Sequence, residues 1–176
     1  MTIAPLLQTE RLNLRGHRMA DFKALHSIWC EPAVYQFILG RPSTPEESWS
    51  RLLRYCGHWS IMDYGYWVIG EKQTGEYIGE MGFADYHREI IPTLEGTPEL
   101  GWALTTASHG KGFATEALSK IIAWGDNNLK HAKTACFISS ENKASIRLAE
   151  KIGYREALRT TYKEDVVDIF YRQRKS

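Results

Sequence analysis

Residues 99–117 read ELGWALTTASHGKGFATEA and decide the fold of this 176-residue chain, because they join a strand pattern to a helix through two glycines. Apolar side chains alternate from Leu100 to Leu104 as in a strand, and Gly110 and Gly112 follow in a polar loop. Glycine lets a ligand approach the main chain closely. Because the first N–H groups of a helix bind anions, this stretch predicts a phosphate or pyrophosphate site.

Strand and helix patterns of ordinary length surround this loop. We expect strands at 10–16, 65–71, 77–86, 99–104, 133–138 and 166–171. Two helices should begin near Asp21 and after the N-cap Thr44, and two more should span 112–129 and about 142–152. The predicted order is β α α β β β α β α β β, which includes one further strand, without assigned bounds, between helix 142–152 and strand 166–171. Strand 99–104, helix 112–129 and strand 133–138 form one βαβ unit with parallel strands, whereas the tight turn at 72–76 makes its two strands antiparallel. The fold class is therefore α+β with a mixed sheet.

Composition limits the class of protein. Residues 1–176 contain 43% apolar and 24% charged residues, which predicts a single globular domain. The net charge of +1 argues against binding of nucleic acid or a membrane surface through charge. Neither a secretory segment nor a run of about 20 apolar residues is evident. Cys30, Cys56 and Cys136 match no metal spacing, so we expect free thiols, no metal and a cytoplasmic location.

Two nucleotide-binding motifs can be tested against the glycine loop. A Walker A loop needs a hydroxyl residue after its lysine, but Gly112 follows Lys111. A dinucleotide-binding fingerprint needs a third glycine, and Thr115 stands at that position. Both interpretations are weakened, although a plain glycine-rich turn and a different nucleotide binder stay open as alternatives.

Four segments together resemble one family. They are TERLNLR at 9–15, PELGWAL at 98–104, HGKGFATEAL at 109–118 and ENKASIRLAEKIGYRE at 141–156. With the order of elements they resemble the GNAT superfamily of acetyl-CoA-dependent N-acetyltransferases, most closely its ribosomal-protein N-terminal (alanine/serine) acetyltransferase branch. The resemblance covers about residues 8–172. It implies the GNAT fold, with the parallel βαβ unit forming the cofactor site, and acetyl-CoA as the acyl donor.

The resemblance also implies which residues hold the donor. The family's pyrophosphate loop falls on His109, Gly110, Lys111, Gly112, Phe113 and Ala114, and we add the flanking Leu104 and Thr115. His109 departs from the commoner glutamine or arginine, which leaves binding by backbone N–H groups in place. The family's asparagine near the pantetheine arm falls on Asn142, which is also a good helix N-cap. Ser145 matches the serine that follows it, and is alternatively a solvated residue of the first helical turn.

The catalytic groups follow from the same resemblance. A backbone N–H of strand 99–104 would polarise the thioester carbonyl, and Glu99 would act as general base. Glu99 is alternatively a solvated residue at the strand end, and Glu80 is a reserve carboxylate. Many members carry a tyrosine as general acid where this chain has Ala149. We therefore expect Ser145 to be the acid, with Tyr154 as a second candidate.

The function implied is acetyl transfer to a primary amine by direct attack in a ternary complex. The acceptor would be a protein N-terminus or a small amine bound between residues 30–47 and strands 65–85, where aromatic side chains are either pocket walls or core. Acidic clusters typical of polyamine or aminoglycoside pockets are not evident. The alternative is a non-catalytic acyl-CoA-binding sensor, supported by Ala149. We expect a monomer or homodimer that binds neither nucleic acid nor membrane.

Overall fold

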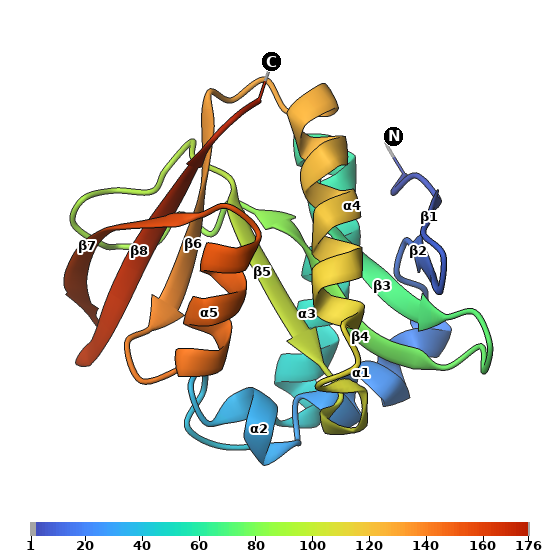
Figure 1. Ribbon diagram of the computed structural model, residues 1–176. Coiled ribbons are helices and arrows are strands. Elements are labelled where there is room, and N and C mark those ends of the chain that lie inside the picture. The colour runs from blue at the N-terminus through green and yellow to red at the C-terminus, as the bar shows by residue number, and fades with distance from the viewer. Residues whose placement is uncertain (1–2, 176) are drawn as a thin grey trace.

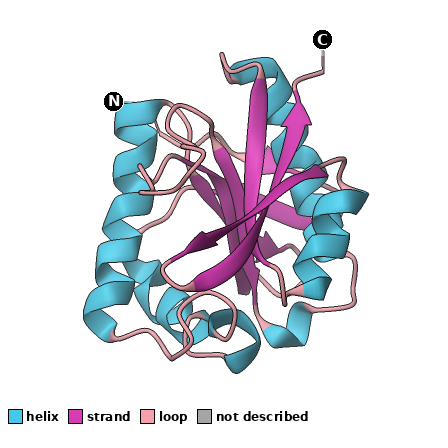
Figure 2. Cartoon of the chain, turned by 90° about the vertical axis from the view of Figure 1, so that its left-hand side faces the viewer, coloured by secondary structure: helices cyan, strands magenta, loops and turns pink. Residues whose placement is uncertain are grey.

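A computed structural model describes residues 3–175, which form one eight-stranded sheet with helices on both faces (Figures 1 and 2). The strands are β1 (Leu7–Gln8), β2 (Leu12–Arg15), β3 (Tyr66–Glu71), β4 (Tyr77–Ala84), β5 (Glu99–Leu104), β6 (Lys133–Ser139), β7 (Arg155–Tyr162) and β8 (Asp165–Gln173). The α-helices are α1 (Phe22–Ile28), α2 (Pro32–Tyr35), α3 (Pro45–Met62), α4 (Phe113–Asn128) and α5 (Lys143–Lys151), with 3-10 turns η1 (Met19–Asp21) and η2 (Thr106–Ser108). No described helix has both the length and the apolar character that crossing a membrane requires.

The predicted mixed sheet is confirmed. Its strand order is β1-β2-β3-β4-β5-β6-β8-β7, and only β5 and β6 are parallel. The N-cap predicted at Thr44 is also present, and it is part of a capping box in which Glu47 N–H donates to Thr44 Oγ1 and Thr44 N–H donates to the Glu47 carboxylate.

Two short elements were not predicted from the sequence. The strand β1 has only two residues and pairs with β2. The helix α2 begins at Pro32, shortly after the end of α1. Proline is well suited to the first turn of a helix because its missing N–H would have no partner there, so it begins a new short helix.

Alternation along the strands divides the core into two sides. Leu100 and Leu104 of β5 join the large cluster that includes the buried stripe of α4, whereas Ala103 joins the cluster formed with α1 and α3. Side chains of successive strand residues point to opposite faces. Glu99 therefore lies on the same face as Ala103, toward α1 and α3, and this is the face from which a second molecule would reach it.

The two parallel strands separate after a single residue pair. Glu99 of β5 is paired with Ala135 of β6, and no further pair joins these strands in the described chain, although both continue. Figure 1 shows β5 and β6 diverging from this point, with α5 beside the gap. This divergence opens the sheet at its centre and gives the fold its site.

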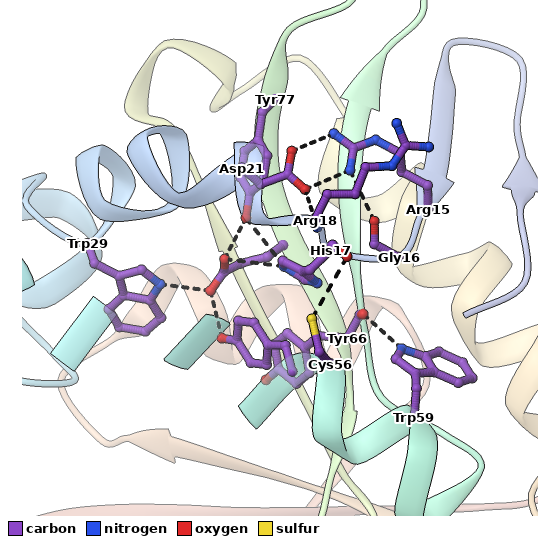
Figure 3. A network of polar contacts seen from close by, with 12 residues as sticks. Arg15, Gly16, His17, Arg18, Asp21, Trp29, Cys56, Trp59, Tyr66 and Tyr77 are labelled. Atoms are coloured by element: carbon purple, nitrogen blue, oxygen red, sulfur yellow. Dashed lines mark hydrogen bonds and ion pairs between the residues drawn. The ribbon is translucent and has the colours of Figure 1, made fainter. Parts of the chain in front are cut away.

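A buried carboxylate fixes α1 and α3 against β4 (Figure 3). Glu80 has no solvent exposure and accepts hydrogen bonds from Trp29 Nε1 at 2.7 Å, Tyr55 Oη at 2.6 Å and Tyr77 Oη at 2.6 Å. Burial alone would raise the pKa of Glu80, but His17 at 3.8 Å and the tyrosine donors outweigh it and lower the pKa. Glu80 is therefore a structural anion, held charged by its neighbours.

The Glu80→Ala variant should lose about 3 kcal/mol of unfolding free energy, because three buried donors then lack an acceptor. Glu76→Ala, on the exposed turn before β4, should change it by less than about 0.5 kcal/mol. Urea unfolding followed by circular dichroism measures both. A Glu80→Ala protein as stable as Glu76→Ala would contradict the anchoring role.

Candidate active site

The glycine loop lies between β5 and α4, as predicted. Gly110 and Gly112 have φ values of +74° and +81°, in the left-handed region that favours glycine. Gly112 is the N-cap of α4 and supplies no side chain to satisfy the first N–H groups of the helix. A Cβ atom at Gly110 would meet nothing within 4 Å, so the space above this backbone is open. These features fit a pyrophosphate group bound by backbone N–H groups.

Arg11 of the turn between β1 and β2 holds the loop in place. Its Nη1 donates to Lys111 O at 3.0 Å, its Nε donates to Glu116 Oε2 at 2.7 Å, and its guanidinium lies 4.5 Å from the centre of the Phe113 ring. Glu116 also accepts from Thr9 Oγ1 at 2.6 Å. Burial opposes the charge of Glu116, but Thr9 and Arg11 outweigh it and lower its pKa. Arg11 therefore links Glu116, in the first turn of α4, to the backbone of the glycine loop.

The remaining loop residues contribute mainly through their backbone. His109 and Lys111 are exposed, and His109 Nε2 lies 3.1 Å from Leu104 O. The Phe113 side chain is buried in the core, so only its main chain can face a ligand. Ala114 and Thr115 are half-buried in the first turn of α4.

A cleft of about 490 Å³ lies where β5 and β6 diverge. It is lined from the α1 and α3 side by aromatic and basic residues, from the centre by β5, and from the other side by β6, the start of α5 and the turn between β7 and β8. Among the lining residues are three predicted from the sequence, Glu99, Asn142 and Ser145. Ligand sites of small molecules are commonly clefts of this size.

Glu99 is 5% exposed and paired with Arg88, whose Nε lies 2.9 Å from Oε2 and 3.1 Å from Oε1. It is therefore not a solvated strand-end residue. Burial raises the pKa of Glu99, and Arg88 only partly offsets this effect. A carboxylate with a raised pKa is a better proton acceptor near neutral pH, so the environment of Glu99 suits a general base. Glu80 has no surface on the cleft, so the reserve role does not fit its position.

The start of α5 brings Asn142 and Ser145 together. Asn142 Oδ1 accepts from Ser145 N–H at 3.1 Å, so Asn142 is the N-cap of this helix, and both residues also line the cleft. Ala149 is fully buried in the core. Tyr154 is buried as well, with its hydroxyl 2.6 Å from Thr134 Oγ1, so Ser145 is the only one of our two candidate acids that reaches the cleft.

The free edge of β5 supplies backbone donors. Thr105 N–H donates to Ile78 O, and this bond identifies which residues of β5 direct their backbone groups toward β4. In such a ladder alternate residues direct their N–H and C=O groups to the two sides. Trp102 therefore directs its N–H away from β4, toward the gap left by β6.

Sequence reasoning missed the arginines of this site. Arg11 lies in the segment TERLNLR, which contributes to the family resemblance. The sequence therefore marked the segment, but it did not indicate the contact of Arg11 with the glycine loop. Arg88 comes from the long loop before β5, where no pattern indicates its partner. Arg51 and Arg54 of α3 also line the cleft, and their helical pattern gave no sign of it.

A family model described as an acetyltransferase (GNAT) domain matches residues 11–155. The chain belongs to the GNAT acetyltransferase family. It is 29% identical over 169 residues to the N-acetyltransferase p20 of Bacillus licheniformis. The alignment covers 93% of this chain and 92% of p20. A GNAT-family acetyltransferase from Bordetella pertussis superimposes with a TM-score of 0.84 at 27% identity, over 96% of this chain and 99% of that one.

More distant structures share the GNAT fold. A ribosomal L7/L12 α-N-protein acetyltransferase in complex with coenzyme A has a TM-score of 0.78 at 15% identity, over 96% of this chain and 98% of that one. The family and its relatives make this chain an acetyltransferase, which counts against the non-catalytic sensor.

The Arg88→Ala variant should raise the pKa of Glu99 further, because the burial remains while the nearest positive charge is removed. Lys163→Ala removes a charge that lines the same cleft but makes no ion pair with Glu99 in the described structure, and should have a smaller effect. Carbon-13 NMR of labelled glutamate carboxyls across a pH series measures the shift. An unchanged Glu99 pKa in Arg88→Ala would show that the ion pair does not control this carboxylate.

Proposed function

We propose that this enzyme transfers an acetyl group from acetyl-CoA to a primary amine by direct attack within a ternary complex. The observation that carries the proposal is the divergence of β5 and β6 from the pair at Glu99, together with the glycine loop that follows the other end of β5. A buried carboxylate and a loop suited to an anion would thus lie at the two ends of the free edge of β5. The related L7/L12 acetyltransferase was solved with coenzyme A, which supports this donor.

The loop would hold the donor through its backbone. The N–H groups from Gly110 to Thr115 would bind the pyrophosphate, since the helix dipole and the free donors both favour an anion. Leu104 and Asn142 would flank the arm that leads into the cleft. Acetyl-CoA supplies the activated acetyl thioester, and it needs no metal ion from the protein.

The chain's own groups divide the proton transfers between them. The Trp102 N–H would donate to the thioester carbonyl oxygen and stabilise the charge that develops there. Glu99 would accept a proton from the attacking amine, as its raised pKa favours. As the C–N bond forms and the C–S bond breaks, Ser145 would donate a proton to the departing sulfur and recover one from water.

The need for a base depends on the acceptor. An α-amine with a pKa near 7.8 is roughly a quarter neutral at pH 7.4, whereas a lysine with a pKa near 10.4 is only about 0.1% neutral. A single carboxylate paired with Arg88 is a modest base. It is better matched to an α-amine or another amine of low pKa than to a lysine side chain.

The first test is binding of the donor. At a concentration about 100 times Kd, coenzyme A should stabilise the fold by about 2.7 kcal/mol, and ATP or NADH should do much less. Gly112→Val should abolish the effect, because the positive φ and close backbone approach do not tolerate a branched side chain. Lys111→Ala removes only an exposed charge, so this variant should retain most of the stabilisation by coenzyme A. Thermal unfolding with each ligand measures the stabilisation. Equal stabilisation by coenzyme A, ATP and NADH would indicate only a general anion site.

The second test concerns proton transfer. Glu99→Gln should lower kcat at pH 7 by about 100-fold, and its defect should shrink as pH rises, because free amine then forms without a base. Ser145→Ala should lower kcat more than it raises KM for acetyl-CoA, since an acid acts only on the departing thiolate. Steady-state thiol release from pH 6.5 to 10 measures both. A Glu99→Gln defect that is constant across this range would assign Glu99 a positional role.

A further inference from the structure

The lining of the cleft carries an excess of positive charge. Its basic lining residues are Arg51, Arg54, Arg88 and Lys163, against the acidic Glu99 and Asp165. Arg88 is already paired with Glu99, Lys163 lies in the turn between β7 and β8, and Asp165 is the first residue of β8. Arg51 and Arg54 remain, and neither forms an ion pair with a carboxylate within residues 3–175.

Arg51 is held firmly but lacks an acceptor for one of its donors. Its guanidinium carbon lies 3.4 Å from the centre of the Trp29 ring, a close cation–π contact. Its Nε is buried and has no hydrogen-bond partner in the described structure. Buried donors are nearly always paired, so an exception in a ligand cleft points to a missing acceptor. Burial opposes the charge of Arg51, but Tyr55 and Glu80 outweigh it and raise its pKa.

Glu80 is not the acceptor that the Nε of Arg51 lacks. It accepts hydrogen bonds from Trp29, Tyr55 and Tyr77, and it does not line the cleft. Its charge stabilises the charged form of Arg51 from behind the cleft wall. The front of Arg51 is left for a second anion that enters from solvent.

Arg54 extends the positive surface by one helical turn. Residues three apart lie on the same face of a helix, so Arg54 neighbours Arg51 along α3. Its guanidinium carbon lies 5.3 Å from the centre of the Tyr86 ring, and its side chain is exposed. Two neighbouring guanidinium groups repel a polycation and bind a carboxylate in a geometry that suits it.

We propose that the acceptor is a small amine that carries a carboxylate group, such as an amino acid, with the carboxylate bound by Arg51 and Arg54 and the amine directed to Glu99. This assignment rests on the proposed acetyl transfer and specifies its acceptor. A small molecule fits better than a long peptide because the loop at 37–39 and the β7–β8 turn both border the cleft. The aromatic rings of Trp29 and Tyr86 provide walls for the rest of the acceptor.

The test compares acceptors that differ only in charge. Thiol release from acetyl-CoA is measured with L-amino acids, their carboxamides, putrescine as a polyamine-type probe, and tetrapeptide amides with a free N-terminus. The carboxylates should have kcat/KM at least tenfold above their carboxamides, and putrescine should be the poorest acceptor. Equal rates for carboxylates and carboxamides, or a preference for putrescine or the tetrapeptides, would overturn the proposal.

Variants of α3 assign the effect to these side chains. Arg51→Gln and Arg54→Gln should each raise KM for the preferred carboxylate at least fivefold, leave the carboxamide unchanged and leave Kd for coenzyme A unchanged. Lys23→Gln removes an exposed charge of α1 outside the cleft and should behave as wild type. If Arg51→Gln does not fold, the exposed Arg54→Gln still decides, and its unchanged carboxylate preference would contradict the proposal. Coenzyme A binding without transfer to any amine would instead refute the proposed function.

Discussion

The separation of β5 from β6 after the pair Glu99–Ala135 is the constraint on which the site depends. A continuous parallel ladder would consume the N–H of Trp102 and close the centre of the sheet. Because the strands diverge, β5 keeps a free edge, and α4 begins at the end of the same strand with its own free donors. The turn between β1 and β2 then secures the glycine loop through Arg11. One interruption of the sheet thus underlies both the proposed donor site and the proposed chemistry.

Two buried carboxylates of neighbouring strands illustrate how surroundings decide a role. Glu80 accepts three short hydrogen bonds, and His17 and the two tyrosine donors lower its pKa and make it a structural anion. Glu99 has one ion pair and opens on the cleft, and burial raises its pKa. The sequence shows two glutamates in similar strand patterns. Only the surroundings distinguish the structural anion Glu80 from the proposed base Glu99.

Local signals made most of the fold predictable. The alternation in β5, the glycines before α4 and the capping box of α3 each act within a few residues, so the pattern defines the element. The helix α2 was not predicted, because a proline at the first position of a helix cannot be distinguished in the sequence from a proline just beyond a helix end. The glycine loop and the start of α5 could be placed for the same local reason.

Long-range pairs could not be predicted in this way. Arg11 is separated by about a hundred residues from Lys111 and Glu116, and Arg51 meets Trp29 only after α1 and α3 have packed on β4. The divergence of β5 and β6 is equally invisible, because both strands have complete apolar patterns. The charge at the proposed acceptor end of the cleft depends on how the helices pack, and so it became visible only in the structure.

The most direct measurement of this account is a titration of the nitrogen-15-labelled protein with acetyl-CoA, followed through its backbone amide signals. If the loop and the free edge of β5 form one site, the N–H signals of Gly110, Gly112 and Trp102 should shift together and saturate at one equivalent of ligand. Loop signals that shift while Trp102 stays unchanged would contradict it, because the opening between β5 and β6 would then hold no part of the donor.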